Sequence, residues 1–131
     1  MDSSWKFQDY VDDINRFFVS QGLQVEPFPE VRILRGGNDR FDALAPTGSY
    51  DGSRMVVELY VGQRHLKDIL RSYCHELVHH NQRLAMPEKF LALDKSGSLD
   101  ENADLEKWEA DAFRRGNLLF RRWTETKKPR G

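Results

Sequence analysis

Apolar residues recur at helical spacing near the N-terminus. They lie three or four positions apart: Phe7, Val11, Ile14 and Phe18. This spacing predicts an amphipathic helix, which Ser4 can cap and Gly22 can end. The following stretch VEPFPE has prolines at positions 27 and 29, which favour extended backbone. We therefore expect a helix followed by an extended connection.

The middle of the chain has the composition of strands and turns. VRIL (31–34) and MVVELYV (55–61) are rich in β-branched residues and predict strands, and FDALA (41–45) is a weaker candidate. GGN (36–38) and PTGSYDGSR (46–54) are rich in turn-forming residues and predict turns. A strand edge, with MVVELYV as the candidate, is where an extended peptide could be bound by backbone pairing.

Two longer helices follow. The first is expected from about Arg64 to Ala85, ended by Pro87. Its apolar stripe is Leu66, Ile69, Leu70, Tyr73, Leu77 and Leu84. After a loop at DKSGS (94–98), the capping-box pattern from Ser98 to Glu101 can start a last helix that runs to about Trp123. This order of elements predicts an α+β fold with a small antiparallel or mixed sheet.

Composition limits the classes to which the protein can belong. The 131 residues suggest a single domain over 1–131, and the 39% hydrophobic and 31% charged shares fit a globular protein. A net charge of −1 gives no global attraction to nucleic acid or membrane. Cys74 is the only cysteine, and we see neither a signal peptide nor a membrane span, so we expect a reducing, cytoplasmic location.

The stretch RSYCHELVHHNQR (71–83) contains the motif H-E-x-x-H. His75 and His79 are about 40° apart around a helix, so both imidazoles can reach one zinc ion at about 2.0–2.1 Å. Glu76 borders the same site, where it can accept a proton from a zinc-bound water. His80 points elsewhere and is a poor ligand. The two histidines lie opposite the apolar stripe, so they face either a cleft or, in the alternative without metal, solvent.

A third ligand must be acidic, because no histidine follows His80. The last helix offers five candidates: Glu101, Asp104, Glu106, Glu109 and Asp111. Around a helical wheel, Glu109 falls in the middle of the apolar face, Glu106 falls at its edge and Asp111 falls outside it. A carboxylate in a buried face needs a compensating partner. Periodicity therefore selects Glu109 as the zinc ligand. The alternatives are a buried ion pair with an arginine and a carboxylate at the rim of an imperfect apolar stripe.

H-E-x-x-H followed by a glutamate on a later helix is the gluzincin pattern, and EADAF (109–113) resembles the segment that carries the third ligand in that clan. More closely, 48–83 and EADAFRRGNLLFRRW (109–123) resemble small zinc metallopeptidases of tailed phages, especially those infecting cyanobacteria. The resemblance covers about 49–123, except for 86–100. It implies a minimal gluzincin fold, in which a small sheet packs on the H-E-x-x-H helix and a C-terminal glutamate-bearing helix. It also implies a place in the host cytoplasm.

By this resemblance His75, His79 and Glu109 bind Zn²⁺ and Glu76 is the general base. The chain departs from the pattern at Phe113, where many gluzincins have an aspartate that supports the site. The groups that orient the histidines are therefore unassigned. Asp68, Asn81 and Asp111 are the candidates by proximity in sequence.

The favoured function is hydrolysis of a peptide or protein substrate by a zinc-activated water. Four side chains are candidate donors to the oxyanion of that reaction, although each could equally serve packing: Tyr60, Arg64, His65 and His80. The alternative function is a zinc-stabilised binding module without catalysis, which would contact a host protein or nucleic acid. Seven basic residues after position 113 would serve a nucleic-acid contact, but no recognised binding motif accompanies them.

Overall fold

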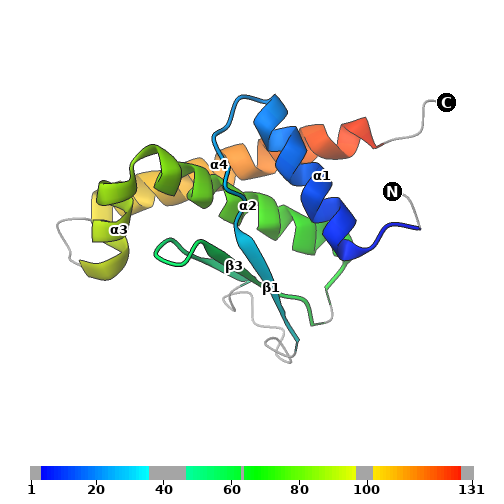
Figure 1. Ribbon diagram of the computed structural model, residues 1–131, viewed down its shortest axis with the longest axis horizontal. Coiled ribbons are helices and arrows are strands. Elements are labelled where there is room, and N and C mark those ends of the chain that lie inside the picture. Colours follow the sequence, from blue (N-terminus) through cyan, green and yellow to red (C-terminus); the bar gives the residue numbers. More distant parts are fainter. Residues whose placement is uncertain (1–3, 36–46, 63, 97–101, 128–131) are drawn as a thin grey trace.

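The computed structural model describes residues 4–35, 47–62, 64–96 and 102–127. Within these ranges the chain forms four helices and three strands (Figure 1). They are α1 (Phe7–Ser20), β1 (Glu30–Leu34), β2 (Gly48–Asp51), β3 (Val56–Tyr60), α2 (Leu66–Ala85), α3 (Pro87–Ser96) and α4 (Asn102–Thr126). The predicted α+β class is confirmed. The predicted strand at 41–45, the turn at 36–38 and the capping box at 98–101 lie outside the described residues.

The sheet is mixed and has the order β1-β3-β2. β3 lies in the centre, parallel to β1 and antiparallel to β2. Residues 48–51 were expected to be part of a turn, so β2 corrects that prediction. The turn itself is shorter and joins β2 to β3, where the Asp51 carboxylate accepts hydrogen bonds from Ser53 and from the backbone of Arg54. The strand expected at 55–61 is therefore the one with a neighbour on both sides.

Helix α1 begins two residues later than a cap at Ser4 would place it. Its N-cap is Lys6, whose backbone N–H donates to the Asp9 carboxylate at 2.7 Å. Gly22 follows the helix with φ +87°, a conformation that glycine adopts without strain. The amphipathic helix is thus present where the apolar spacing predicted it, with a different cap.

Helix α3 was not expected. Pro87 does end α2, as predicted, but it is also the first residue of the next helix. Proline suits this first position, because its missing N–H would have no partner inside the helix anyway. The buried ring of Phe90 then anchors α3, since it stacks on Trp108 of α4 with centroids 5.1 Å apart.

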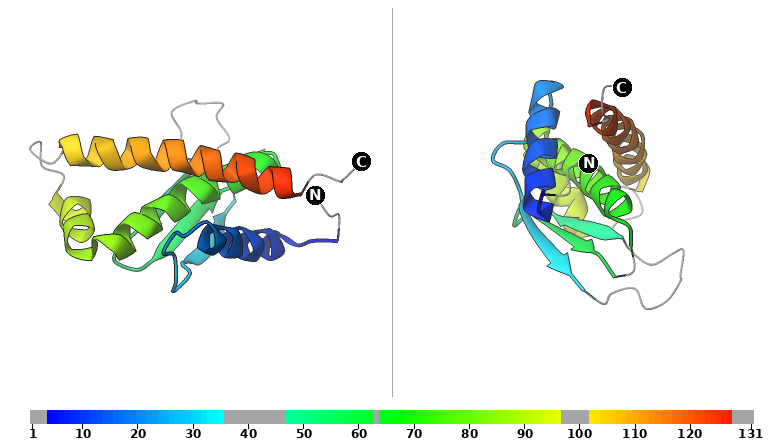
Figure 2. Two further views of the ribbon diagram at one scale, coloured as in Figure 1. Left: turned by 90° about the horizontal axis from the view of Figure 1, so that it is seen from above. Right: turned by 90° about the vertical axis from the view of Figure 1, so that its right-hand side faces the viewer.

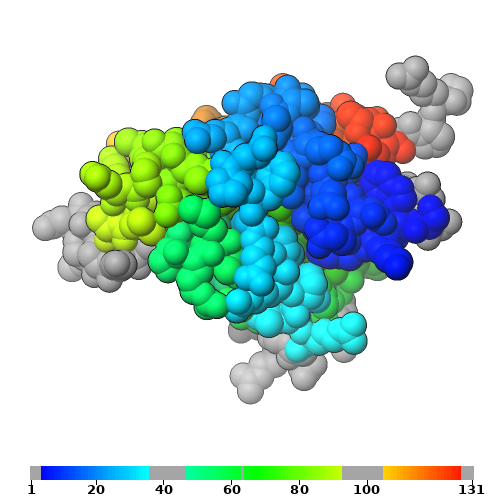
Figure 3. All heavy atoms as spheres, viewed as in Figure 1, coloured from blue at the N-terminus to red at the C-terminus, as the bar shows by residue number. Residues whose placement is uncertain are grey.

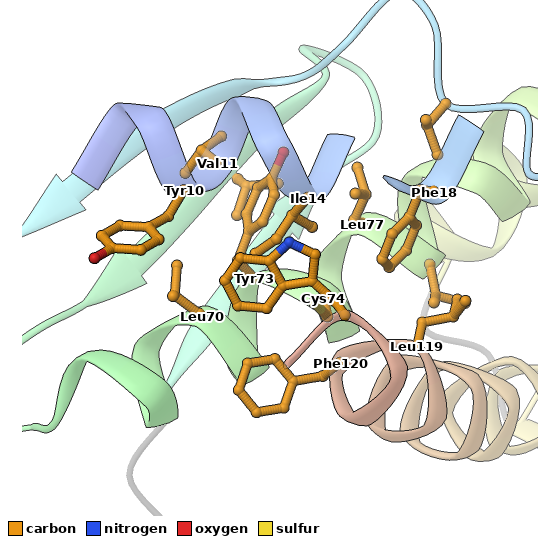
Figure 4. Close-up of a cluster of buried hydrophobic side chains, with 14 of the residues drawn as sticks. Tyr10, Val11, Ile14, Phe18, Leu70, Tyr73, Cys74, Leu77, Leu119 and Phe120 are labelled. Atoms are coloured by element: carbon orange, nitrogen blue, oxygen red, sulfur yellow. The ribbon is translucent and has the colours of Figure 1, made fainter. Parts of the chain in front are cut away.

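One hydrophobic core joins α1, α2, α4 and β3 (Figure 4). It contains Leu70, Tyr73 and Leu77 of α2, Ile14 and Phe18 of α1, and further side chains of α4 and β3. In Figure 2, α1 and α4 flank α2, and the sheet lies along a further side of it. Figure 3 shows the face formed by α1, β1 and the segment between them, from which α4 is largely hidden.

The predicted stripe of α2 needs a correction. Leu66 is 36% exposed, whereas Cys74 and Val78, which lie beside the predicted stripe, are buried. The second half of α2 is surrounded by α4, α1 and the sheet, so most of its circumference is covered. None of the described helices is long and apolar enough to cross a membrane.

Candidate metal centre

The two histidines of H-E-x-x-H converge with a carboxylate from another helix. His75 and His79 lie one turn apart on α2, with ring centroids 5.0 Å apart. Glu109 of α4 approaches both: its carboxylate lies 2.5 Å from Nε2 of His75 and 3.4 Å from Nε2 of His79. One ligand atom from each residue falls within 4.8 Å of the others. The structure thus brings together the three residues predicted as ligands.

Close packing of α4 on α2 makes this convergence possible. A Cβ atom at Gly116 would lie 2.9 Å from the His75 Cα, a distance that real side chains do not tolerate. Glycine therefore allows the two helix backbones to approach at this point. Glu109 lies seven residues, about two turns, before Gly116 on α4. The close approach brings this part of α4 against the histidine-bearing part of α2.

Gln82 orients His79. Its Oε1 atom lies 2.8 Å from Nδ1 of His79, so Nδ1–H donates to it and Nε2 faces the cluster. The Gln82 side chain is buried, and its Nε2–H₂ group donates to the Trp108 carbonyl at 2.9 Å and to Asp111 at 3.0 Å. Sequence reasoning did not assign this role to Gln82. The available signal was a position three residues after His79, on a neighbouring part of the helix surface.

Of the three orienting residues proposed by proximity, Asp111 acts one step further away, through Gln82, and Asn81 is connected only through Arg115. Asp111 accepts from Gln82 and from the Arg115 guanidinium, and Arg115 also donates to Asn81 at 3.3 Å. Asp68 instead pairs with Arg71 at 3.4 Å. Ion pairing with Arg115 lowers the pKa of Asp111, although burial alone would raise it. The chain from His79 through Gln82 and Asp111 to Arg115 fixes the imidazole without a carboxylate in direct contact.

Glu76 borders the same cleft from a more buried position. Its side chain is only 7% exposed, and it lines the cleft beside His75 and His79. Burial raises the pKa of the Glu76 carboxyl, the two histidines lower it, and Glu109 raises it again. Gly48 of β2 lies opposite, where an added Cβ would be 3.5 Å from the Glu76 Cγ. Glu76 is therefore held between α2 and the edge strand of the sheet.

The burial argument that selected Glu109 was wrong in one respect. The side chain of Glu109 is 64% exposed, and Phe113, expected on the same apolar face, is 65% exposed. The face of α4 that packs on the core is centred instead on Ala112, Leu119 and Trp123. Glu109 lies at the rim of that face, over the histidines, and forms no buried pair with an arginine of the described residues.

The donor set fits a zinc ion. Hydrogen bonds from His75 and His79 hold the pKa of Glu109 well below its usual range, so it is a carboxylate. Burial alone would lower the pKa of His79, but its contacts with Glu109, Glu76 and Gln82 raise it. Two imidazoles and one carboxylate are a common ligand set of catalytic zinc, whose tetrahedral geometry places donor atoms roughly 3.3 Å apart. The 3.4 Å between His79 and Glu109 matches that spacing, whereas His75 lies closer to Glu109, at 2.5 Å, in direct hydrogen-bond contact.

The cluster opens into a cleft of about 720 Å³. One wall is formed by Thr47 and by residues 48–50 of β2, and the others come from α2, α4 and Phe90 of α3. The candidate oxyanion donors Tyr60, Arg64, His65 and His80 do not line it. The cleft is lined by Ser72, Arg71 and Asn117 as further polar side chains.

Arg64, His80 and Cys74 have structural positions. The Arg64 guanidinium donates to the carbonyls of Thr47, Tyr60 and Asp68 and so ties the sheet to α2. His80 is fully buried, 2.7 Å from the Pro27 carbonyl and 2.6 Å from the Tyr50 hydroxyl, and burial lowers its pKa. Cys74 is buried in the core, and burial raises the pKa of its thiol.

Comparisons with known proteins leave the site to be interpreted from its geometry. No protein-family model matches the chain, and no curated protein or solved structure is significantly similar to it.

Proposed function

We propose that the protein is a zinc-dependent peptidase of the gluzincin type. The observation that carries this proposal is the convergence of three ligand side chains beside a fourth, buried acid. His75, His79 and Glu109 would hold the metal, and Glu76 lines the same cleft without belonging to the ligand cluster. A purely structural zinc site has four protein ligands and needs no such acid, whereas a catalytic site has three.

Zinc at this position would polarise a substrate carbonyl and make a water molecule acidic near neutral pH. The residues of the chain supply the remaining chemistry. Glu76 accepts the proton of the attacking water on its carboxylate and passes it to the nitrogen of the leaving amine, so that one C–N bond is hydrolysed without net proton change. Gln82 keeps Nδ1 of His79 protonated, so that Nε2 would stay directed at the metal throughout the reaction.

The edge of β2 is the natural binding place for an extended substrate. MVVELYV was the candidate from sequence, but β3 has β1 on one side and β2 on the other, so it offers no free edge. β2 pairs with β3 on one side only within the described sheet, and its residues 48–50 line the cleft. A peptide paired with β2 would place a carbonyl between Glu76 and the ligand cluster.

The alternatives make different use of the same surfaces. A zinc-stabilised binding module would not need an acid such as Glu76 beside the ligand cluster. A nucleic-acid contact through the basic end of α4 is weakened by the partners of two of its cations: Arg115 is bound to Asp111 and Lys127 to Asp13. Lys128 and Arg130 lie outside the described residues.

The test is hydrolysis of a diverse peptide library by the zinc-loaded protein. Wild type is expected to cleave a subset of the peptides, and Glu76→Gln to lower kcat/KM by about 10²–10⁴-fold, the usual range for general acid–base assistance. Zinc content and the midpoint of unfolding should stay unchanged in the variant. Equal cleavage by both proteins, or none by wild type at any neutral pH, would contradict the proposal.

A further inference from the structure

A second groove continues the cleft beyond the ligand cluster, between α2 and α4. It has a volume of about 550 Å³ and is lined by Lys67, Arg71, Phe113, Asn117, Phe120, Arg121 and Thr124. Arg71, Phe113 and Asn117 line both this groove and the main cleft. The groove is therefore one end of the same cleft. We call it the basic groove.

The charge of the basic groove is one-sided. Its lining contains three cations, Lys67, Arg71 and Arg121, and no acidic side chain. Arg71 pairs with Asp68 at 3.4 Å and Arg121 with Glu125 at 3.7 Å, but all four side chains are about half exposed or more. Such exposed pairs are weak and exchange readily. Lys67 makes no ion pair with a described residue. An anion entering the groove would therefore meet cations without strong competing partners.

The position of Arg71 sets the distance to the ligand cluster. Arg71 lies one turn before His75 on the same side of α2, about 6 Å away along the helix axis. An extended peptide advances about 3.3 Å per residue, so 6 Å corresponds to about two residues. The Arg71 guanidinium also lies 5.3 Å from the centre of the Phe120 ring, which holds it over the groove. Lys67 lies one turn farther along the helix.

The opposite end of the cleft has a different character. There the lining is aromatic: Phe90 and Trp108 stack with an interplanar angle of 15°, and Tyr50 packs on Phe90. His79 lies next to Phe90, with ring centroids 6.4 Å apart. The ligand cluster thus separates an aromatic end from a cationic end. A substrate that fits the whole cleft carries an apolar residue on one side of the reacting bond and an acid on the other.

From this asymmetry we infer that the basic groove is a subsite for an acidic side chain of the substrate, about two residues from the bond that is cleaved. The inference rests on the proposed peptidase function only in placing the acidic residue relative to a cleaved bond. Recognition of an acidic peptide itself can be measured without turnover. A carboxylate in the groove accepts charge-assisted hydrogen bonds from Arg71 and Lys67. Phe113 and Phe120 supply apolar surface for the methylene groups of a glutamate.

The first experiment compares paired peptides that differ only by Glu or Gln at each position around the cleaved bond. Wild type should favour Glu at one position by about tenfold in kcat/KM, mainly through KM, because the contact is charge-assisted but partly exposed. Raising the salt concentration should reduce the preference. Lys67→Gln/Arg71→Gln should abolish it, and Lys67→Glu/Arg71→Glu should favour a Lys peptide. Arg122→Gln, an exposed arginine of α4 outside the groove, is the matched control and should keep the Glu preference.

The second experiment measures binding of the same labelled peptides to zinc-loaded Glu76→Gln protein by fluorescence anisotropy. Tighter binding of the acidic peptide that disappears in Lys67→Gln/Arg71→Gln supports the subsite even if wild type cleaves nothing, which would overturn only the peptidase. Cleavage of both peptides at equal rates would overturn the subsite and leave the peptidase intact. Equal binding of both peptides, or stronger competition by a single-stranded oligonucleotide than by the acidic peptide, would also overturn the subsite.

Discussion

On one side of α2, Leu70, Tyr73 and Leu77 are fully buried against α1 and α4. On another, His75, Glu76 and His79 line an open cleft. Polar groups on the core side are paired with one another. Tyr73 donates its hydroxyl proton to Asn15 at 2.6 Å, and Asp13 accepts from both Trp123 and Lys127. Both of these acceptors therefore have donors within the fold.

The cleft side is organised differently. Nδ1–H of His79 donates to Gln82, and Nε2 of His79 faces the carboxylate of Glu109. His75 faces the same carboxylate. One potential ligand atom from each of the three residues therefore lies within 4.8 Å of the others. The contrast teaches that two imidazoles and a carboxylate gathered at an open cleft form a potential metal site, whereas polar groups paired within the core only satisfy one another.

The largest expected effect comes from the core side. Leu70→Ala should lower the free energy of unfolding by about 2–5 kcal/mol, because a fully buried leucine leaves a cavity. Zinc affinity per folded molecule should stay within a few-fold of wild type. Chemical denaturation and zinc titration of the same samples check both halves. A large loss of zinc affinity in folded Leu70→Ala protein would show that the two sides of α2 are not separable.

On the cleft side, Glu109→Ala should weaken zinc binding by more than about 100-fold, beyond the usual cost of losing an outer partner. Its effect on the stability of the metal-free protein should be small, because the side chain is 64% exposed. Asp111→Ala should weaken zinc binding less, and Glu106→Ala least. Competition with a chelator of known affinity measures all three. Equal losses would show that Glu109 has no special place among the acids of α4.

Gln82→Ala tests the orientation of His79. Loss of an outer hydrogen-bond partner of a metal-binding histidine typically costs about 10–100-fold in metal affinity. Gln21→Ala, at an exposed glutamine just after α1, is the control and should leave affinity unchanged. Chelator-competition curves measure the zinc affinity of wild type and of both variants. If Gln82→Ala binds zinc as tightly as wild type, the hydrogen bond seen at 2.8 Å does not hold the ring.

The smallest effect concerns Asp13 and acid. Burial alone would raise the pKa of Asp13, but hydrogen bonds from Lys127 and Trp123, together with the charges of Lys127 and Arg16, lower it. A lowered pKa in the folded state stabilises the protein above the unfolded pKa of about 3.9, and that stability is lost as the pH falls through the folded value. Between about pH 5 and pH 3, the free energy of unfolding should therefore fall by about 1 kcal/mol less in Asp13→Asn than in wild type. The same dependence of the free energy of unfolding on pH in both proteins would contradict this assignment.

Much of the fold follows from local pattern. The apolar spacing of α1 and α4 and the β-branched run of β3 predicted these elements close to their observed places. β2 was missed because GSYD has the composition of a turn and becomes a strand only by pairing with β3. α3 was missed because Pro87 was taken only as the end of α2, although proline is favoured at the first position of a helix.

The site residues likewise differ in how far local pattern predicted them. Helical geometry alone placed His75 and His79 together, because the two lie on one helix. Glu109 required knowledge of how α4 packs on α2, and a helical wheel placed it in the buried centre rather than at the rim. Gln82 could not be assigned, because its role depends on the Trp108 carbonyl and Asp111 of another helix. Contacts between elements distant in sequence are what local pattern leaves out.

The zinc content of the purified protein tests the central claim most directly. After zinc loading and mild dialysis, elemental analysis should find about one zinc per chain in wild type. His75→Ala/His79→Ala should retain almost no zinc, while circular dichroism should show that this variant is folded. The core-side variant Tyr73→Phe, which loses only the hydroxyl bonded to Asn15, should retain the full amount. Wild type without zinc, or a double variant that keeps it, would contradict the account.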